Sequence, residues 1–444
     1  MKIIIIGGIA AGMSAAAKAK RVSEDAEIVV YEMGDIISFG ACGLPYYVGD
    51  FFQNPNWMIA RKVERMIDEG VDVRVNHQVL SVDSDLKSVK VKRLETDEVF
   101  EEKYDKLMIA TGANVVMPPF ENIGLDNIFT LSKMSDGMGL KEKAMSDEVK
   151  DVTIIGAGFI GVEVVEAMKK LGKHVRLIQR GNRVFNRIFD ERITELMHQE
   201  FLDHDVELVL NEGVQGFEGQ DKVQKVKTDK GVYETDLVVI ATGFKPNTDF
   251  LEGSNIKMLK NGAIIVNRQG ETNIQDIYSA GDCATVPHMI DNEDVYIPLA
   301  TGANKLGRVV GENMAGGKTE YPGSLGSACV KVMDYEAAVT GLNEEQAKSR
   351  GIECSNVFVK DKNQAGYYPN QEDIYIKLVY EKDSKVIIGG ETLGKNGAAL
   401  RIDVIAMAIK AKMTTEDLGM MDFCYSPPIS KTWDALNVAG NVAK

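Results

Sequence analysis

The chain has 444 residues, enough for roughly three domains of about 100 to 200 residues, and its 44% hydrophobic and 26% charged residues are typical of a folded globular protein. Its net charge of −15 opposes binding to nucleic acid or to an anionic membrane surface, so neither partner is expected. The five cysteines lack paired spacing, which argues against a disulfide framework and a cysteine-built metal site. The N-terminal apolar run is too short for a signal peptide, and no segment has the roughly 18 apolar residues that span a bilayer. A cytoplasmic protein without a metal ion is expected.

Residues 2–32 have the pattern of a βαβ unit: an apolar strand, a glycine turn, an alanine-rich helix and a second apolar strand. The turn is a loose dinucleotide fingerprint, because Ile9 stands where the middle glycine is expected. Glu32 ends the second strand, at the distance where an acidic residue binds ribose hydroxyls. The nucleotide contacts expected in this turn are Gly7, Gly8, Ala11 and Gly12.

The same order of elements returns at 151–180, about 150 residues later, so we expect two bound nucleotides. This turn matches Gly-x-Gly-x-x-Gly, which lets a pyrophosphate approach the N-terminus of a helix. The strand that follows ends in Gln179 rather than an acidic residue, and Arg180 and Arg183 come next. Without a carboxylate to repel a 2′-phosphate, NADPH is permitted, although both arginines could simply be solvated. The contacts expected in the turn are Gly156, Gly158, Phe159, Ile160 and Gly161.

Each βαβ unit is followed by an apolar strand that ends in Ala-Thr-Gly, at 106–112 and at 237–243. Small residues at a strand end let the backbone approach a ligand closely. Farther along, Ser-Ala-Gly-Asp at 279–282 precedes a predicted helix, and Asp282 could either bind a ligand or cap a helix. The cofactor contacts expected in these segments are Ala110, Thr111, Gly112, Gly243, Gly281, Asp282, Pro298 and Ala300.

From about residue 321 the sequence predicts a strand meander packed by helices. This part contains no third glycine fingerprint. The expected fold class is therefore α/β, with two Rossmann-like dinucleotide-binding domains and a C-terminal α+β domain. The predicted strands are 328–333, 356–361, 373–380 and 385–393, and the predicted helix lies near 398–412.

The most distinctive stretch surrounds Cys42, in Ser-Phe-Gly-Ala-Cys-Gly-Leu-Pro-Tyr-Tyr at 38–47. A lone cysteine is usually an inert, buried hydrophobe. Here glycines flank Cys42 and a predicted helix start follows it, a setting that lowers the pKa of a thiol and exposes its sulfur. No other cysteine occurs before Cys283. Cys42 is therefore expected to form its disulfide with another molecule or to be oxidised to a sulfenic acid.

Together the two nucleotide units, the Cys42 stretch, both Ala-Thr-Gly strands and Ser-Ala-Gly-Asp resemble the single-cysteine branch of the flavin-dependent pyridine nucleotide disulfide oxidoreductases. Within this branch the chain is most similar to coenzyme A disulfide reductases, and the resemblance covers the whole sequence. It implies that FAD binds to 1–113 with 245–320, that NADH or NADPH binds to 114–244, and that 321–444 is a dimerisation domain. It also implies that Cys42 forms a mixed disulfide with coenzyme A, in a homodimer whose active site is shared between subunits.

The resemblance further implies that two tyrosines of the partner subunit approach the active sulfur, and the matching positions are Tyr367 and Tyr425. A phenol there can give a proton or a hydrogen bond to the leaving thiolate. The last histidine is His288, so the histidine base of glutathione-reductase-like relatives has no counterpart. Without the resemblance, a packed aromatic would be the simpler interpretation of either tyrosine.

Coenzyme A is a polyanion, and in the family part of its contacts come from the helix after the first glycine turn. A solvated helix face is the alternative for such residues. The positions that we expect to bind coenzyme A, with coenzyme A disulfide as the substrate, are Ser14, Lys18, Arg21, Ser38, Phe39, Arg61, Asn304 and Lys431.

Three other functions stay open. NADH oxidases and peroxidases of this branch use the cysteine as a sulfenic acid, but they carry a histidine in the first turn where this chain has Ala10. Persulfide or polysulfide reductases often carry an extra rhodanese domain, which this sequence lacks. A non-catalytic flavoprotein that senses NADH would not need Cys42. The choice between NADH and NADPH is also open.

Overall fold

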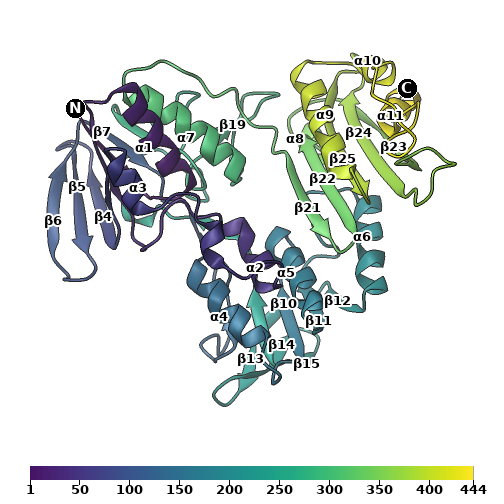
Figure 1. Cartoon of the computed structure of the whole chain (residues 1–444), viewed down its shortest axis with the longest axis horizontal. Helices are drawn as coiled ribbons and strands as arrows, with labels where there is room; N and C mark the ends of the chain where they lie inside the picture. Colours follow the sequence, from purple (N-terminus) through teal and green to yellow (C-terminus); the bar gives the residue numbers. More distant parts are fainter. Residues whose placement is uncertain (444) are drawn as a thin grey trace. The chain divides into compact units, whose positions relative to one another are not determined.

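The structure, a computed structural model, describes residues 1–443 and forms two compact units (Figure 1). Unit 1 contains residues 1–43, 54–116 and 244–324. Unit 2 contains residues 44–53 and 117–243, and the chain from 325 onward. The segment 44–53, which begins two residues after Cys42, thus packs with unit 2.

Unit 1 is built on a parallel sheet of order β18-β7-β1-β2-β3. Its central strand β1 is a run of four isoleucines, of which Ile3, Ile4 and Ile5 are fully buried, as expected for a parallel strand covered on both faces. The helices α1 and α7 pack against each other (Figure 1). The elements are β1 (Lys2–Ile6), α1 (Ala10–Val22), β2 (Glu27–Tyr31), β3 (Asp72–Arg74), β7 (Lys106–Ile109), β18 (Ile277–Ser279) and α7 (Ala300–Met314).

A three-stranded antiparallel sheet is inserted in unit 1 between β3 and β7. A short two-stranded sheet, β8 with β17, joins the chain segments that leave and re-enter this unit. The remaining elements of unit 1 are α3 (Val63–Asp68), β4 (His77–Asp83), β5 (Ser88–Arg93), β6 (Val99–Lys103), β8 (Ala113–Val115), β17 (Phe244–Pro246), β19 (Val286–Pro287) and β20 (Asp294–Val295).

The first half of unit 2 repeats this plan, with a parallel sheet of order β12-β11-β10-β16-β9 and an inserted antiparallel sheet β13-β14-β15. The short helix α2, which follows the Cys42 stretch, packs against α4 and α5. The elements are α2 (Leu44–Val48), β9 (Ile128–Phe129), α4 (Met134–Ala144), β10 (Asp151–Ile155), α5 (Phe159–Lys170), β11 (His174–Gln179), α6 (Glu191–Asp203), β12 (Val206–Leu210), β13 (Val214–Gly219), β14 (Val223–Thr228), β15 (Val232–Glu234) and β16 (Leu237–Ile240).

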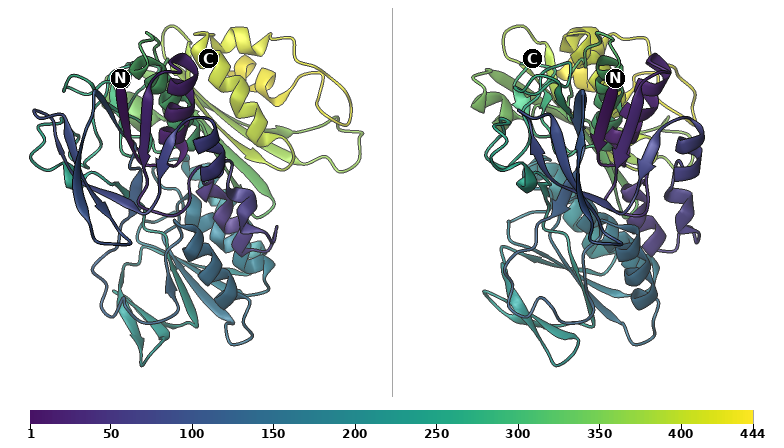
Figure 2. Two further views of the ribbon diagram at one scale, coloured as in Figure 1. Left: turned by 60° about the vertical axis from the view of Figure 1, so that its left-hand side comes forward. Right: turned by 90° about the vertical axis from the view of Figure 1, so that its left-hand side faces the viewer.

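The second half of unit 2 is an antiparallel sheet with helices, as predicted, but it contains a strand that was not predicted, β22, and its order β21-β22-β25-β24-β23 is a meander only from β23 to β25. Every residue of β25 is buried, so this strand takes the centre of the sheet between β22 and β24. The helix α9 packs along β22 and β25 (Figures 1 and 2). The elements are β21 (Ala328–Val332), β22 (Tyr335–Gly341), α8 (Glu344–Ser349), β23 (Cys354–Lys362), β24 (Asp373–Glu381), β25 (Ile387–Gly394), α9 (Ala398–Lys410), α10 (Thr415–Gly419) and α11 (Ala435–Val442).

Candidate active site

In unit 1 the predicted cofactor residues meet at one edge of the parallel sheet. Gly7 follows β1, Glu32 follows β2, Ala110 follows β7, and Ala280 follows β18. Because the strands are parallel, their carboxyl ends share that edge. Gly7 has φ +105°, and a Cβ there would lie 2.2 Å from the carbonyl oxygen of Ala110. The first turn therefore needs glycine for its conformation and for this close approach.

The first turns of α1 and α7 meet beside Gly281. A Cβ on Gly281 would lie 3.0 Å from the Cβ of Ala11 and 3.8 Å from that of Ala303. The residues before the two helices are Ile9 and Leu299, whose side chains cannot accept a hydrogen bond. The first N–H groups of both helices therefore lack side-chain caps, which is the arrangement that binds a pyrophosphate.

Two carboxylates frame this edge. Glu32 accepts hydrogen bonds from the backbone N–H groups of Gly8, at 2.7 Å, and Gly34, at 2.8 Å. Asp282 lies in a turn, so the helix-cap interpretation of this residue is wrong: α7 begins only at Ala300. Burial raises the pKa of Asp282, and no hydrogen bond from a described residue reaches its carboxylate. This partly buried carboxylate is therefore available to accept a hydrogen bond from a ligand hydroxyl.

The second glycine turn, in unit 2, has the same geometry. Gly156 has φ +106°, and a Cβ there would lie 2.3 Å from the Ala241 carbonyl oxygen. A Cβ on Gly161 would lie 1.9 Å from the Gly156 oxygen. Gly158 differs, since no described atom lies within 4 Å of its Cβ position. The fold therefore requires glycine at 156 and 161, whereas Gly158 keeps open the space in which a pyrophosphate is expected.

The segment of unit 2 that is predicted to lie near the adenosine ribose is held in part by hydrogen bonds within the protein. Gln179 ends β11 and accepts a hydrogen bond at 3.4 Å from the backbone N–H of Ala157. Arg180 is exposed. Arg183 is not simply solvated, because its guanidinium donates to the carbonyl oxygens of Asn186, at 3.1 Å, and Phe189, at 3.3 Å. Arg183 thus organises its own loop, and Arg180 is the arginine open to a 2′-phosphate.

Cys42 is exposed on a 3₁₀ turn, Ala41–Gly43, and α2 starts directly after it, as predicted. The stretch before the cysteine is tied to the first glycine turn, because the backbone N–H of Ser38 donates to the Gly8 oxygen at 2.9 Å. Ser38 has φ +51°, and Phe39 pairs with Ile59 in an isolated β-bridge. The sulfur is therefore presented on a loop fixed to the predicted flavin turn.

In unit 2 the structure brings Tyr367 and Tyr425 together. Their hydroxyl oxygens are 2.8 Å apart although the residues are 58 positions apart in sequence. Tyr367 is 75% exposed and Tyr425 44% exposed. The hydrogen bond with Tyr367 raises the pKa of the Tyr425 phenol. Both tyrosines thus present one linked pair of hydroxyls to solvent.

The predicted coenzyme A contacts fall into separate groups. Ser14 on α1 donates to Asn304 on α7 at 2.8 Å, and Lys18 forms an ion pair with Glu312 at 2.9 Å. These four residues lie along the contact between α1 and α7 in unit 1. Arg21 is exposed at the end of α1, and Arg61 lies 3.7 Å from the Met66 sulfur. Lys431 belongs to unit 2, where it pairs with Asp361 at 2.5 Å.

A carboxyl group in α5 was missed by the sequence predictions. Glu163 is half-buried, and the Tyr46 hydroxyl donates to it at 3.3 Å. Burial, and secondarily the negative charge of Glu166, raise the pKa of Glu163 to about 7, so the group can exchange a proton near neutral pH. The sequence feature that could have revealed this carboxyl group is the pair Glu163 and Glu166, which lie on one face of a helix that is otherwise apolar up to Met168.

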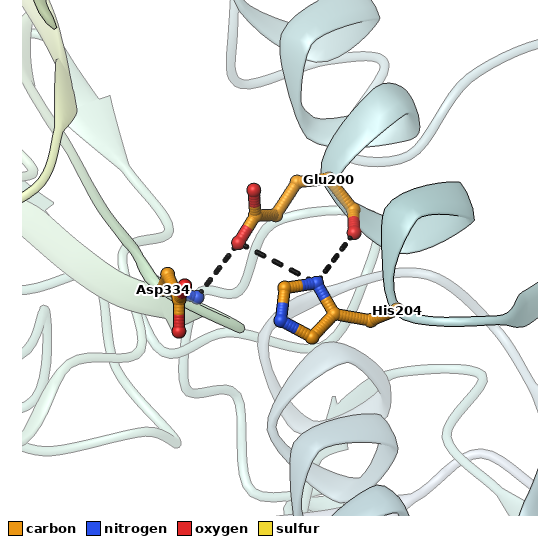
Figure 3. A group of neighbouring side chains, drawn as sticks. All are labelled: Glu200, His204 and Asp334. Atoms are coloured by element: carbon orange, nitrogen blue, oxygen red, sulfur yellow. Dashed lines mark hydrogen bonds and ion pairs between the residues drawn. The ribbon is translucent and has the colours of Figure 1, made fainter.

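One group of possible metal ligands exists among the described residues: Glu200, His204 and Asp334 (Figure 3). Their donor atoms are already used. Glu200 accepts the backbone N–H of Asp334 at 2.9 Å, and His204 Nδ1 contacts the Glu200 carbonyl oxygen at 2.9 Å. These contacts tie the end of α6 to the turn between β21 and β22 (Figure 3).

Comparison with protein families decides the class. The family model "Pyridine nucleotide-disulphide oxidoreductase" matches residues 1–307, and the model of the dimerisation domain of the same family matches residues 327–436. The chain belongs to this family. It is therefore an oxidoreductase with the predicted fold, and the family implies FAD and a nicotinamide nucleotide as cofactors. The uncapped helix starts in unit 1 and the open space at Gly158 in unit 2 fit these two groups.

Relatives carry three activities in their names. The chain is 36% identical over 444 residues to an NAD(P)H coenzyme A polysulfide/persulfide reductase of Pyrococcus horikoshii, with 100% of this chain and 98% of the relative covered. It is 31% identical over 445 residues to coenzyme A disulfide reductase of Staphylococcus aureus, with 100% of both covered. The structure of the water-forming NADH oxidase of Lactobacillus brevis superposes with a TM-score of 0.95 at 34% identity, covering 100% of this chain and 98% of that one.

One of these matches bears on the extra rhodanese domain that was expected of persulfide reductases. The Pyrococcus protein is covered over 98% of its length, so a persulfide reductase need not carry an extra rhodanese domain.

None of the helices within residues 1–443 is both long and apolar enough to cross a bilayer.

Proposed function

We propose that the protein uses NAD(P)H to reduce coenzyme A disulfide through a mixed disulfide between Cys42 and coenzyme A. The observation that carries this proposal is the exposure of the Cys42 thiol in a unit that offers no second exposed cysteine. The other cysteine of that unit, Cys283, is fully buried, and its sulfur lies 3.5 Å from the Ile109 carbonyl oxygen and 3.5 Å from the Ser279 hydroxyl. Because the second cysteine of unit 1 is buried, we infer that Cys42 forms its disulfide with a thiol of another molecule.

We assign the cofactors to the same parts as the sequence did. Residues 1–113 and 245–320 bind FAD, with the pyrophosphate at the starts of α1 and α7 and the ribose hydroxyls at Glu32. Residues 114–244 bind the nicotinamide nucleotide at the turn that contains Gly158. Residues 321–444 form the interface of a homodimer. A cytoplasmic location belongs to the proposal and is supported by the five cysteines without paired spacing.

The reaction balances in two steps. When bound, FAD supplies the transfer of two electrons from NAD(P)H to sulfur. Two electrons and one proton convert the mixed disulfide into the Cys42 thiolate and one coenzyme A thiol. The thiolate attacks coenzyme A disulfide, which re-forms the mixed disulfide, and the leaving coenzyme A thiolate takes a second proton. The sum is NAD(P)H, H⁺ and coenzyme A disulfide giving NAD(P)⁺ and two coenzyme A.

The chain's own residues bind the substrate and handle the protons. Tyr367 and Tyr425 of the partner subunit hold the leaving thiolate by a hydrogen bond and supply its proton. The cationic side chains proposed to bind coenzyme A phosphates are Lys18, Arg21, Arg61 and Lys431. Ser14 and Asn304 fix the pantetheine arm, while Ser38 and Phe39 line the approach to the sulfur. Glu312 and Asp361 release their lysines when the phosphates arrive.

Replacing the sulfur tests the proposal. In Cys42→Ser, turnover of coenzyme A disulfide should fall to background, while anaerobic NAD(P)H still bleaches the flavin absorbance. Cys354→Ser, which changes a half-buried cysteine of β23, is the control and should keep full turnover. Retention of disulfide turnover by Cys42→Ser would refute the proposed role of this sulfur.

A further inference from the structure

The loop 181–190 packs directly on the second glycine turn. The backbone N–H of Phe185 donates to the Ala157 carbonyl oxygen at 3.0 Å, and the rings of Phe185 and Phe159 are 5.2 Å apart. Phe185 has φ +47°, a conformation that an aromatic residue keeps only where its surroundings hold it. The position of this loop therefore sets the shape of the turn at residues 156–161.

The far end of the loop is held by buried charges of the C-terminal sheet. Asp190 donates its backbone N–H to Glu391 of β25 at 2.6 Å, and its carboxylate pairs with Lys377 of β24 at 2.6 Å. Lys377 also pairs with Glu344 of α8 at 2.8 Å. Lys377 is 2% exposed and Glu391 1% exposed. We call Asp190, Glu344, Lys377 and Glu391 the Lys377 cluster.

Joining two elements through the buried charges of the Lys377 cluster carries a high free-energy cost. It places three carboxylates around one lysine, and Glu391 Oε1 lies 3.7 Å from Lys377 and accepts no hydrogen bond from a described residue. Apolar side chains usually join elements with equal or greater stability. At the other end of α6, Glu200 accepts the Asp334 N–H without such crowding (Figure 3). The crowding of three carboxylates around one lysine occurs at the end of α6 that adjoins loop 181–190.

We propose that Glu391 and Lys377 are positioning residues that hold loop 181–190 against the glycine turn at 156–161, so that the C-terminal sheet sets the affinity for the nicotinamide nucleotide. This inference rests on the proposed binding of NAD(P)H at that turn. Both residues act through Asp190 and Phe185 and touch neither substrate nor reacting atoms. The whole path lies within unit 2.

The cluster also makes this affinity depend on pH. Burial raises the pKa of Glu391 to about 7, against the opposing charge of Lys377. The groups that face Glu391 are Lys377 on β24, Asp190 before α6 and Glu344 on α8. The intact Lys377 cluster, in which Glu391 is buried, holds the Glu391 proton more tightly than a solvated Glu391 would. The intact cluster is therefore favoured at low pH, and this advantage is lost as pH rises through 7.

The test measures the Kd of NADPH and of NADH by anaerobic calorimetry on the flavin-loaded protein, together with kcat at saturating nucleotide. Glu391→Leu should weaken binding of the preferred nucleotide about fivefold to twentyfold, the effect of losing a buried hydrogen bond to a charged group. Its kcat should stay within about twofold, because the Cys42 chemistry is untouched. Glu200→Leu is the matched control, since it removes a buried glutamate that accepts a backbone N–H at the other end of α6, and it should leave Kd unchanged.

A pH series adds a readout that does not depend on the leucine variant folding. The wild-type Kd should rise between pH 6 and pH 8, whereas Glu391→Gln, which stays neutral and still accepts the Asp190 N–H, should give a flat profile. Equal Kd values for wild type and Glu391→Leu, an equal loss in Glu200→Leu, or parallel pH profiles would overturn the inference. If the wild-type protein binds neither nucleotide, the proposed function fails instead.

Discussion

At the scale of single residues, the linked hydroxyls of Tyr367 and Tyr425 make a sharp prediction. Because one hydroxyl donates to the other, the pair has one proton to offer a leaving thiolate. Tyr425→Phe should lower kcat for coenzyme A disulfide by about tenfold to hundredfold, the usual range for loss of a proton donor. Tyr367→Phe should lower kcat by a similar factor. The kcat of the double variant should be no lower than that of the less active single variant, because the two tyrosines act as a unit.

Stopped-flow absorbance separates the steps in these variants, since flavin reduction by NAD(P)H should keep its wild-type rate. Tyr368→Phe, which alters the neighbouring 39% exposed tyrosine, is the control. Wild-type disulfide turnover in Tyr425→Phe would show that this phenol is only a surface aromatic.

Glu163 predicts a pH-dependent stability. Its pKa in the folded protein is about 7, against an ordinary value of 4.5, so its contribution favours folding at low pH and is lost as pH rises from 4.5 through 7. Glu163→Gln removes this loss and should gain on the order of 2 kcal/mol relative to wild type between pH 5 and pH 8. Urea unfolding at both pH values measures the difference. A difference that does not change with pH would contradict the account of this carboxyl.

Residues differed in how far the sequence could predict them. Tyr367 and Tyr425 could be singled out because the family motifs fix their positions along the chain, and the structure brings the two hydroxyls together. Glu163 and Glu391 could not be singled out, since an acidic residue on a helix or strand is usually solvated, and only the folded chain shows that Glu163 is half-buried and Glu391 buried. The helix-cap alternative for Asp282 failed because α7 starts 18 residues downstream, at Ala300.

At the scale of elements, the two glycine turns have one geometry. A Cβ on Gly12 would lie 1.9 Å from the Gly7 oxygen, and a Cβ on Gly161 would lie 1.9 Å from the Gly156 oxygen. In both units the first glycine has φ near +105° and touches the carbonyl of the Ala-Thr-Gly strand. The repeat seen in the sequence therefore reflects a repeated structural solution for the strand-to-helix turn.

Gly158 separates the needs of the fold from those of the ligand. Gly158→Ala should leave the melting temperature within about 1 °C of wild type, because its Cβ meets only open space. It should nevertheless weaken NAD(P)H binding about tenfold, since the methyl group occupies the space expected for the pyrophosphate. Gly156→Ala, which forces a Cβ to 2.3 Å from a carbonyl oxygen, should instead destabilise the whole unit. Calorimetric melting and nucleotide titration give both quantities, and unaltered affinity in Gly158→Ala would move the pyrophosphate elsewhere.

Element types followed well from periodicity, whereas strand order did not. Both βαβ units, the helices at 300–314 and 398–410, and four of the five strands of the C-terminal sheet lie where the apolar patterns predicted them. The strand β22 was not predicted: β23, β24 and β25 pair in chain order as a meander, but β22 lies between β21 and the fully buried β25, so the whole sheet is not one meander. Local pattern carries little information about which strand occupies the centre of a sheet.

At the scale of the whole molecule, the proposed homodimer has a testable consequence. If Tyr367 and Tyr425 of the partner subunit complete the site at Cys42, a dimer of one Cys42→Ser and one Tyr425→Phe chain holds one intact site. Such a heterodimer, purified with two different tags, should recover about half of the wild-type disulfide turnover, because a symmetric dimer has two sites. Each homodimeric variant is the control. Recovery no greater than the average of the two controls would place the whole site in one chain.

The most direct measurement of the central claim follows NADH and NADPH oxidation by the purified protein under two conditions. One contains coenzyme A disulfide without oxygen, and the other contains oxygen or peroxide without disulfide, with coenzyme A persulfide as a further acceptor in an anaerobic series. The account predicts fast oxidation with the disulfide, slower oxidation with the persulfide and little with oxygen alone. Fast oxidation with oxygen and none with the disulfide would contradict it, and would make Cys42 a sulfenic acid centre in spite of Ala10.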